Sequence, residues 1–176
     1  MKELDDFHNA VLDGVRAHFD GKLKTVTMYD MGNTEPIETQ AALLVMESGG
    51  RGEDLGDGRF PLRCLITLHC ILGFKTEKLA LKLRKFATSV IRLVDQNRWG
   101  MIDAVDLPDI GQDAIGPGEF RPGQEGYDRW YATWEQTVYL GKGVWDPEGV
   151  APEKIYLGQT PAIGAGHEPD YERIDG

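Results

Sequence analysis

The beginning of the chain carries apolar side chains at intervals of three and four, which places them along one side of an α-helix. The apolar positions are Leu4, Phe7, Val11, Leu12, Val15 and Phe19. Asp5 and Asp6 put negative charge near the positive end of the helix dipole. Gly21 is the kind of residue that ends a helix. We therefore predict an amphipathic first helix that packs on an apolar core.

The residues that follow this helix predict three strands, the second of which is apolar enough to be central in a sheet. The first covers residues 25–29, the second residues 41–46, and the third residues 59–74, which form the longest strand signal in the chain. Five glycines fall within residues 49–58. Because such glycine density opposes regular structure, we predict a flexible loop there and a hairpin with a long tip.

A second helix is predicted over residues 76–97, with Thr76 as its N-cap. Its apolar stripe consists of Leu79, Leu83, Phe86, Ala87, Val90 and Val94. One face of the third strand is equally apolar, with Leu62, Cys64, Ile66, Leu68, Cys70 and Leu72. We expect the helix to cover that face.

The last predicted strand, residues 130–141, is rich in aromatic and β-branched residues. A short strand at 104–107 and a second Gly/Pro-rich loop at 111–126 are expected before it. The positions predicted to pack under the helices are Trp130, Trp134, Gln136, Val138 and Leu140. The order of elements predicts an α+β fold, a mostly antiparallel sheet with two main helices packed on one face.

The C-terminal residues 142–176 differ from the rest of the chain. Glycine and proline interrupt every regular pattern there, yet apolar residues recur. We predict an α+β domain over residues 1–141 followed by an extended C-terminal arm over 142–176 that contacts a neighbouring subunit or another partner. The candidate contacts are Trp145, Ile155, Tyr156, Leu157, Ile163 and Tyr171 in the arm, with Arg51, Glu53 and Asp54 in the glycine-rich loop.

Composition narrows the classes of function. The formal net charge of −10 disfavours a general nucleic-acid-binding protein, since neutralising phosphates requires a basic surface. No apolar run approaches the roughly 18 residues that cross a membrane, and the N-terminus lacks the order of a signal peptide. We therefore expect a chain that folds in a cytoplasm. Cys64 and Cys70 share a strand face but lie too far apart to bridge, so we predict small core residues.

Catalytic motifs are absent from the sequence. Ser48 and Ser89 are the only serines, and neither lies in a nucleophile elbow. No phosphate-binding loop with its lysine and hydroxyl occurs. We therefore expect no cofactor and no enzymatic activity.

The histidines and acidic loop residues show no metal-ligand spacing. We interpret His8 and His18 as residues of a helix surface and His69 as a satisfied or exposed residue of the sheet. Glu53 and Asp54, together with the nearby Asp57, depart from the spacing of a calcium loop. We expect no metal site.

Positive charge concentrates in one place. Residues 74–98 contain seven basic residues and two acids, a net charge of +5. Around a helix, four of the basic residues cluster away from the apolar stripe: Lys78, Lys82, Lys85 and Arg92. Three interpretations stay open, namely a solvated surface, a groove that binds the acidic C-terminal arm of an adjacent subunit, and the wall of a lumen through which DNA passes.

The layout resembles the tail terminator, or tail completion, proteins of long-tailed bacteriophages, especially Mu-like phages with flexible tails. The resemblance covers residues 1–141 and rests on the first helix, the paired strands, the second helix and the closing Trp134-Glu-Gln-Thr-Val-Tyr-Leu-Gly141. It implies a ring of six copies that binds the end of the tail tube, stops polymerisation of the tube and presents a surface to the head-tail connector. The implied location is the head-proximal end of the tail in the virion, after assembly in the host cytoplasm.

Other functions remain compatible with these patterns. A neck or head-completion protein of the same particle shares small size, acidity and ring symmetry. A monomeric binding module is the second alternative. An enzyme acting on a small molecule is the least expected, because no convergent set of polar residues is evident.

Overall fold

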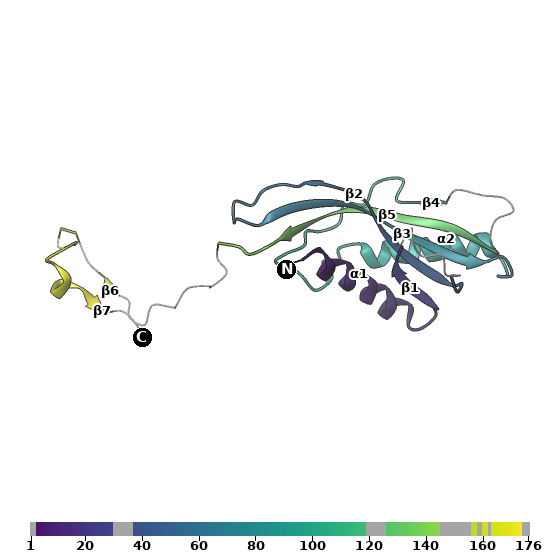
Figure 1. Cartoon of the computed structure of the whole chain (residues 1–176), viewed down its shortest axis with the longest axis horizontal. Helices are drawn as coiled ribbons and strands as arrows, with labels where there is room; N and C mark the ends of the chain where they lie inside the picture. The colour runs from purple at the N-terminus through teal and green to yellow at the C-terminus, as the bar shows by residue number, and fades with distance from the viewer. Residues whose placement is uncertain are drawn as a thin grey trace. The chain divides into compact units, whose positions relative to one another are not determined.

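The structure is a computed structural model (Figure 1). It describes residues 3–29, 37–118, 126–144, 156–157, 160–161 and 163–173. The chain divides into two compact units, Met1–Val144 and Trp145–Gly176.

Helix α1 spans Leu4–Phe19, as the periodicity predicts. A capping box joins Glu3 and Asp6 at its start, and such reciprocal bonds satisfy backbone N–H groups that the first turn leaves free. The helix ends at Phe19, two residues before the predicted Gly21. Asp20 adopts the left-handed conformation at φ 44° and donates its N–H to carbonyls of the last turn.

Five strands form the sheet of the first unit in the order β1-β2-β3-β5-β4. Their bounds are β1 Thr25–Met28, β2 Ala41–Arg51, β3 Phe60–Gly73, β4 Ile115–Pro117 and β5 Tyr127–Leu140. β1 runs parallel to β2, and every other pairing is antiparallel. β3 and β5 pair along their whole length, from Phe60 opposite Leu140 to Gly73 opposite Tyr127. The predicted α+β class with a mostly antiparallel sheet is therefore confirmed.

Both helices lie on the same face of this sheet (Figure 1). The core fills the space between the helices and the sheet. The residues of β3 and β5 predicted to face the helices lie in this core or pack against it, among them Ile66, Leu68 and Val138. Trp134 is 2% exposed, and Cys64 and Cys70 are fully buried free cysteines. Burial raises the pKa of the Cys64 thiol to about 11.

Helix α2 spans Leu79–Val94 and is shorter than predicted. The predicted N-cap, Thr76, is wrong, because Lys78 occupies that position. Thr76 lies in a turn after β3, where its N–H donates to the Gly73 carbonyl. Lys78 precedes the helix in the left-handed conformation, at φ 56°. At the other end, the Asn97 side-chain amide donates to the Leu93 carbonyl at 3.1 Å. The predicted apolar stripe of α2 is confirmed, with Leu83, Phe86, Ala87, Val90 and Val94 buried.

Three predicted segments differ in the structure. The glycine-rich loop does not begin at Gly49, because β2 continues to Arg51 after an irregularity between Met46 and Ser48. The expected strand at 104–107 is reduced to an isolated bridge between Val105 and Val138. Strand β4 lies within the loop predicted at 111–126.

The second unit contains regular structure that its glycine and proline content does not predict. Strands β6, Tyr156–Leu157, and β7, Glu172–Arg173, pair antiparallel, and a 3-10 turn covers Glu168–Asp170. Of the apolar residues predicted to make contacts, Trp145 and Ile155 lie outside the described residues. In the described part of the chain, no helix has the length and apolar character to span a membrane.

Candidate assembly surfaces

The tip of the β2–β3 hairpin holds three of the predicted contact residues, and all three are exposed: Arg51, Glu53 and Asp54. Arg51 donates to the Asp54 carboxylate at 2.7 Å, and the same carboxylate accepts the Gly56 amide at 2.8 Å. The bond from the Gly56 amide and then that from Arg51 hold the pKa of Asp54 below its usual range. These bonds pre-form the turn at the tip.

A second ion pair ties the base of the tip to the rest of the first unit. Arg59 pairs with Asp57 at 2.5 Å, with both side chains less than one-fifth exposed. Arg59 also donates to the Asp103 carbonyl at 2.6 Å. The bonds from the Arg59 side chain and backbone hold the pKa of Asp57 below its usual range. The Asp57 carbonyl accepts the Val144 amide at 2.7 Å, so the tip also fixes the end of the first unit.

Tyr139 completes this connection from the face of β5 opposite the helices, where it is 3% exposed. Its hydroxyl donates to the Asp106 carboxylate at 2.8 Å, and the Arg59 guanidinium lies 5.2 Å from the centre of its ring. Burial, followed by the bond to Asp106, raises the pKa of Tyr139 to about 12. The phenol is therefore neutral at physiological pH and serves as a hydrogen-bond donor.

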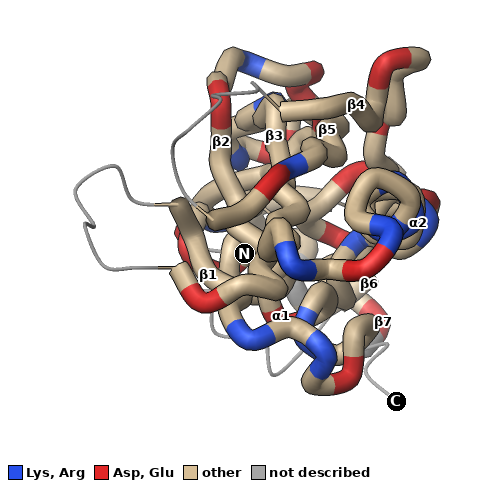
Figure 2. Tube along the Cα trace, turned by 90° about the vertical axis from the view of Figure 1, so that its right-hand side faces the viewer, with Lys and Arg blue, Asp and Glu red and all other residues tan. Residues whose placement is uncertain are grey.

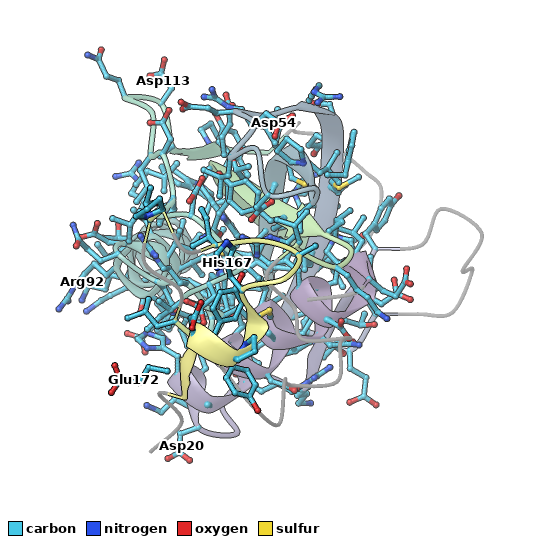
Figure 3. All side chains as sticks on the ribbon, turned by 90° about the vertical axis from the view of Figure 1, so that its left-hand side faces the viewer. Asp20, Asp54, Arg92, Asp113, His167 and Glu172 are labelled. Atoms are coloured by element: carbon cyan, nitrogen blue, oxygen red, sulfur yellow. The ribbon has the colours of Figure 1, made fainter. Side chains whose placement is uncertain are left out.

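The basic face of α2, defined as Lys78, Lys82, Lys85 and Arg92, is exposed along its length. Figure 2 marks the Lys and Arg positions of α2 in blue. Figure 3 shows Arg92 projecting from the outer side of the helix. Within the described part of the chain, no carboxylate lies within ion-pairing distance of any of the four. Arg84 behaves differently, because its guanidinium packs over the Trp130 ring at 5.5 Å. The sequence thus correctly separates this face from the apolar stripe.

Part of the sheet face opposite the helices is polar, beside a small apolar cluster of Ala41, Leu43 and Ile71. Arg63 pairs there with Glu135 and, at 3.3 Å, with Asp109. A cavity of about 330 Å³ lies beside these residues and is lined by the carboxylates of Asp109, Asp113 and Glu135. Its other polar lining residues are Gln112 and Thr133.

The most connected buried polar residue, Gln136, is one that the sequence places on the core face without assigning it a function. Its amide oxygen accepts the indole N–H groups of Trp99 at 3.0 Å and Trp134 at 3.2 Å. Its amide nitrogen donates to the carbonyls of Asn97 at 2.9 Å and Asp106 at 2.7 Å. One side chain therefore joins β5 to the end of α2 and to the connection that follows α2.

Two histidines do not lie where the sequence predicts. His8 is 6% exposed, so its interpretation as a helix-surface residue is wrong. Its Nε2 has no partner among the described residues, and the same holds for Nδ1 of His69. Burial lowers the pKa of both histidines below the usual range, and nearby Arg129 lowers that of His69 further. His18 is exposed, as predicted, and shares a hydrogen bond with Ser89 at 2.9 Å.

The described apolar residues of the second unit are accessible. Tyr156, Leu157 and Ile163 are each about half exposed. Tyr171 is more covered, and its hydroxyl oxygen accepts the Gly164 amide at 2.7 Å. Tyr156 and Leu157 form β6 itself, so this strand presents apolar side chains to solvent.

Among the described residues, no three His, Cys, Asp or Glu side chains gather in a way that could hold a metal ion. Neither the models of known protein families nor the curated protein sequences contain a match to this chain.

Proposed function

We propose that this protein is a structural component of a long-tailed bacteriophage. In this proposal it forms a ring, in six copies, on the end of the tail tube, stops polymerisation of the tube and provides the attachment surface for the head-tail connector. The observation that carries the proposal is the element order, in which a helix, a hairpin, a second helix and a closing strand build a sheet covered on one face. This is the arrangement on which the resemblance to tail terminators rests.

Ring formation requires two different complementary patches on each subunit. The first unit offers two candidates of different chemistry. One is the hairpin tip, with exposed Leu55 and Phe60 around the Arg51–Asp54 pair, and the other is the basic face of α2. Exposed apolar side chains on a hydrogen-bonded turn favour protein contact, because less conformational freedom is lost on binding.

The closing strand supports the same proposal. Trp134 and Gln136, which belong to the Trp-Glu-Gln segment of the resemblance, hold β5 to α2 and to residues 97–106 through the bonds of the Gln136 amide. A rigid centre suits a ring subunit, which transmits contacts between neighbours and does not turn over a substrate. No cofactor takes part in the proposed function, and any contact with genomic DNA occurs only as DNA passes through the ring.

Electron microscopy of the purified full-length protein, alone and mixed with polymerising tail tube protein, tests this proposal. We expect rings alone, and tubes bearing a ring at one end that no longer grow in the mixture. Particles without a central opening, together with tube growth unaffected by a molar excess of this protein, would contradict the proposal.

A further inference from the structure

We propose that the basic face of α2 in one copy binds the acidic C-terminal unit, residues 145–176, of a second copy. This inference rests on the self-association in the proposed function and names the surfaces that mediate it. It does not depend on the tail tube or on the connector.

The two segments carry opposite and equal charge. Residues 145–176 contain seven acids and two bases, a net charge of −5, against +5 for residues 74–98. Two of the acids lie in the described hairpin: Asp170 is exposed beside His167, and Glu172 is exposed in β7. Opposite charges of this size favour encounter and fix orientation between two surfaces.

Apolar contact can add to the attraction of charge. Leu81 is 47% exposed and lies one helical turn from both Lys78 and Lys85, so it sits within the basic face. The second unit presents exposed Tyr156 and Leu157 on β6. Burial of these side chains against one another would supply the part of binding that salt does not screen.

Another acidic segment, residues 101–113, contains four aspartates and no base, and two of the four are already engaged. Of these, Asp106 accepts the Tyr139 hydroxyl and Asp109 pairs with Arg63. Among the described acids of the C-terminal unit, the one ion pair is between Asp170 and His167 in the same turn.

Self-association in the proposed function favours a second copy over the same chain as the source of the C-terminal unit. Chain length does not distinguish the two, because the chain after α2 lies beside the last residues of β5, where the Gln136 amide donates to the Asn97 carbonyl at 2.9 Å. Mixing two variants of opposite charge change does distinguish them.

A charge swap between two full-length variants tests the inference. The first variant carries Lys82→Glu and Lys85→Glu, which lowers the net charge of residues 74–98 from +5 to +1 and leaves its C-terminal unit at −5. The second carries Asp170→Lys and Glu172→Lys, which raises the net charge of residues 145–176 from −5 to −1 and leaves its residues 74–98 at +5. Lys22→Glu with Lys24→Glu is the matched control for the first variant, because it lowers the net charge by the same amount outside the basic face of α2. Far-ultraviolet circular dichroism establishes that each variant is folded.

Sedimentation velocity at low salt gives the readout. Each variant alone should need a concentration roughly tenfold higher than the wild type to assemble, whereas an equimolar mixture should recover most of the loss and the control should assemble normally. The defect should shrink as salt rises.

The remaining outcomes separate the inference from the proposed function. If the wild type assembles and the first variant assembles equally well, the inference fails while the ring stands. The inference also fails if both variants lose assembly and their mixture does not recover it. Binding between α2 and the C-terminal unit of the same chain would give that result. A wild type that is monomeric at every concentration overturns the self-association in both. Normal assembly with weaker retention of DNA would assign the basic face to a lumen.

Discussion

Replacing Gln136 with methionine removes the hydrogen bonds at the centre of β5 while nearly keeping the length and volume of the side chain. The two indole N–H groups of Trp99 and Trp134 then lose the oxygen that accepts them. Each buried donor left without a partner costs about 1–3 kcal/mol. The two indoles together therefore predict a loss of about 2–6 kcal/mol in the free energy of unfolding, with the freed carbonyls of Asn97 and Asp106 adding to it.

Urea unfolding followed by tryptophan fluorescence measures this loss, because Trp99 and Trp134 both lie beside Gln136. The centroids of their rings are 6.4 Å apart. Gln112→Met is the matched control, because Gln112 is exposed, and it should change the free energy of unfolding by less than about 0.5 kcal/mol. A Gln136→Met protein as stable as the Gln112→Met control would refute the reasoning that this amide organises the core.

Three further predictions concern the first unit. Trp134→Ala should destabilise the fold by about 3–5 kcal/mol because it empties a site that is 2% exposed, and an unchanged melting temperature would show that the face assignment is wrong. The pKa of His8 is lowered in the fold, so unfolding takes up a proton below about pH 6.5 and stability falls as pH decreases from there toward the folded pKa. His8→Leu should flatten that dependence in urea unfolding at several pH values, and equal slopes for variant and wild type would argue against it. Tyr139→Phe removes one charge-assisted bond, so it should lower the free energy of unfolding by about 1.5–3 kcal/mol and the thermal midpoint with it. A spectrophotometric titration of the wild type that shows every tyrosine ionising near pH 10 would contradict the raised pKa of Tyr139.

The spacing of apolar residues predicts which face of a helix or strand is buried when that spacing persists along the whole element. The apolar stripe of α1 and the predicted inward-facing residues of β3 and β5 lie in the core or pack against it, because the apolar alternation is long enough to fix the face. The same reasoning separates the basic residues of α2 from its buried side.

Long-range pairing accounts for most of the misplaced boundaries. β2 continues through Gly49 and Gly50 because they lie opposite Cys64 and Arg63 of β3, and that partner supplies an order which glycine by itself does not favour. At Gly116 in β4, a Cβ atom would lie 2.4 Å from the Tyr131 hydroxyl. The sequence places Gly116 in a loop, but in the structure its missing side chain allows β4 to approach β5.

The candidate surfaces were predictable in part, for the same physical reason. Charge counts locate the basic face of α2, since exposure of a helix face follows from its spacing. The Gln136 site depends on groups 30 to 39 residues away in the chain, and the burial of His8 depends on what packs over α1. No local pattern carries that information.

The length of tails in particles assembled without this protein tests the central claim most directly. Negative-stain micrographs of a lysate from which only this chain is missing give the distribution of tail lengths. A tail terminator predicts overlong or ragged tails that do not join filled heads. Tails of normal length beside heads that have lost their DNA would contradict the terminator assignment and favour the neck or head-completion alternative.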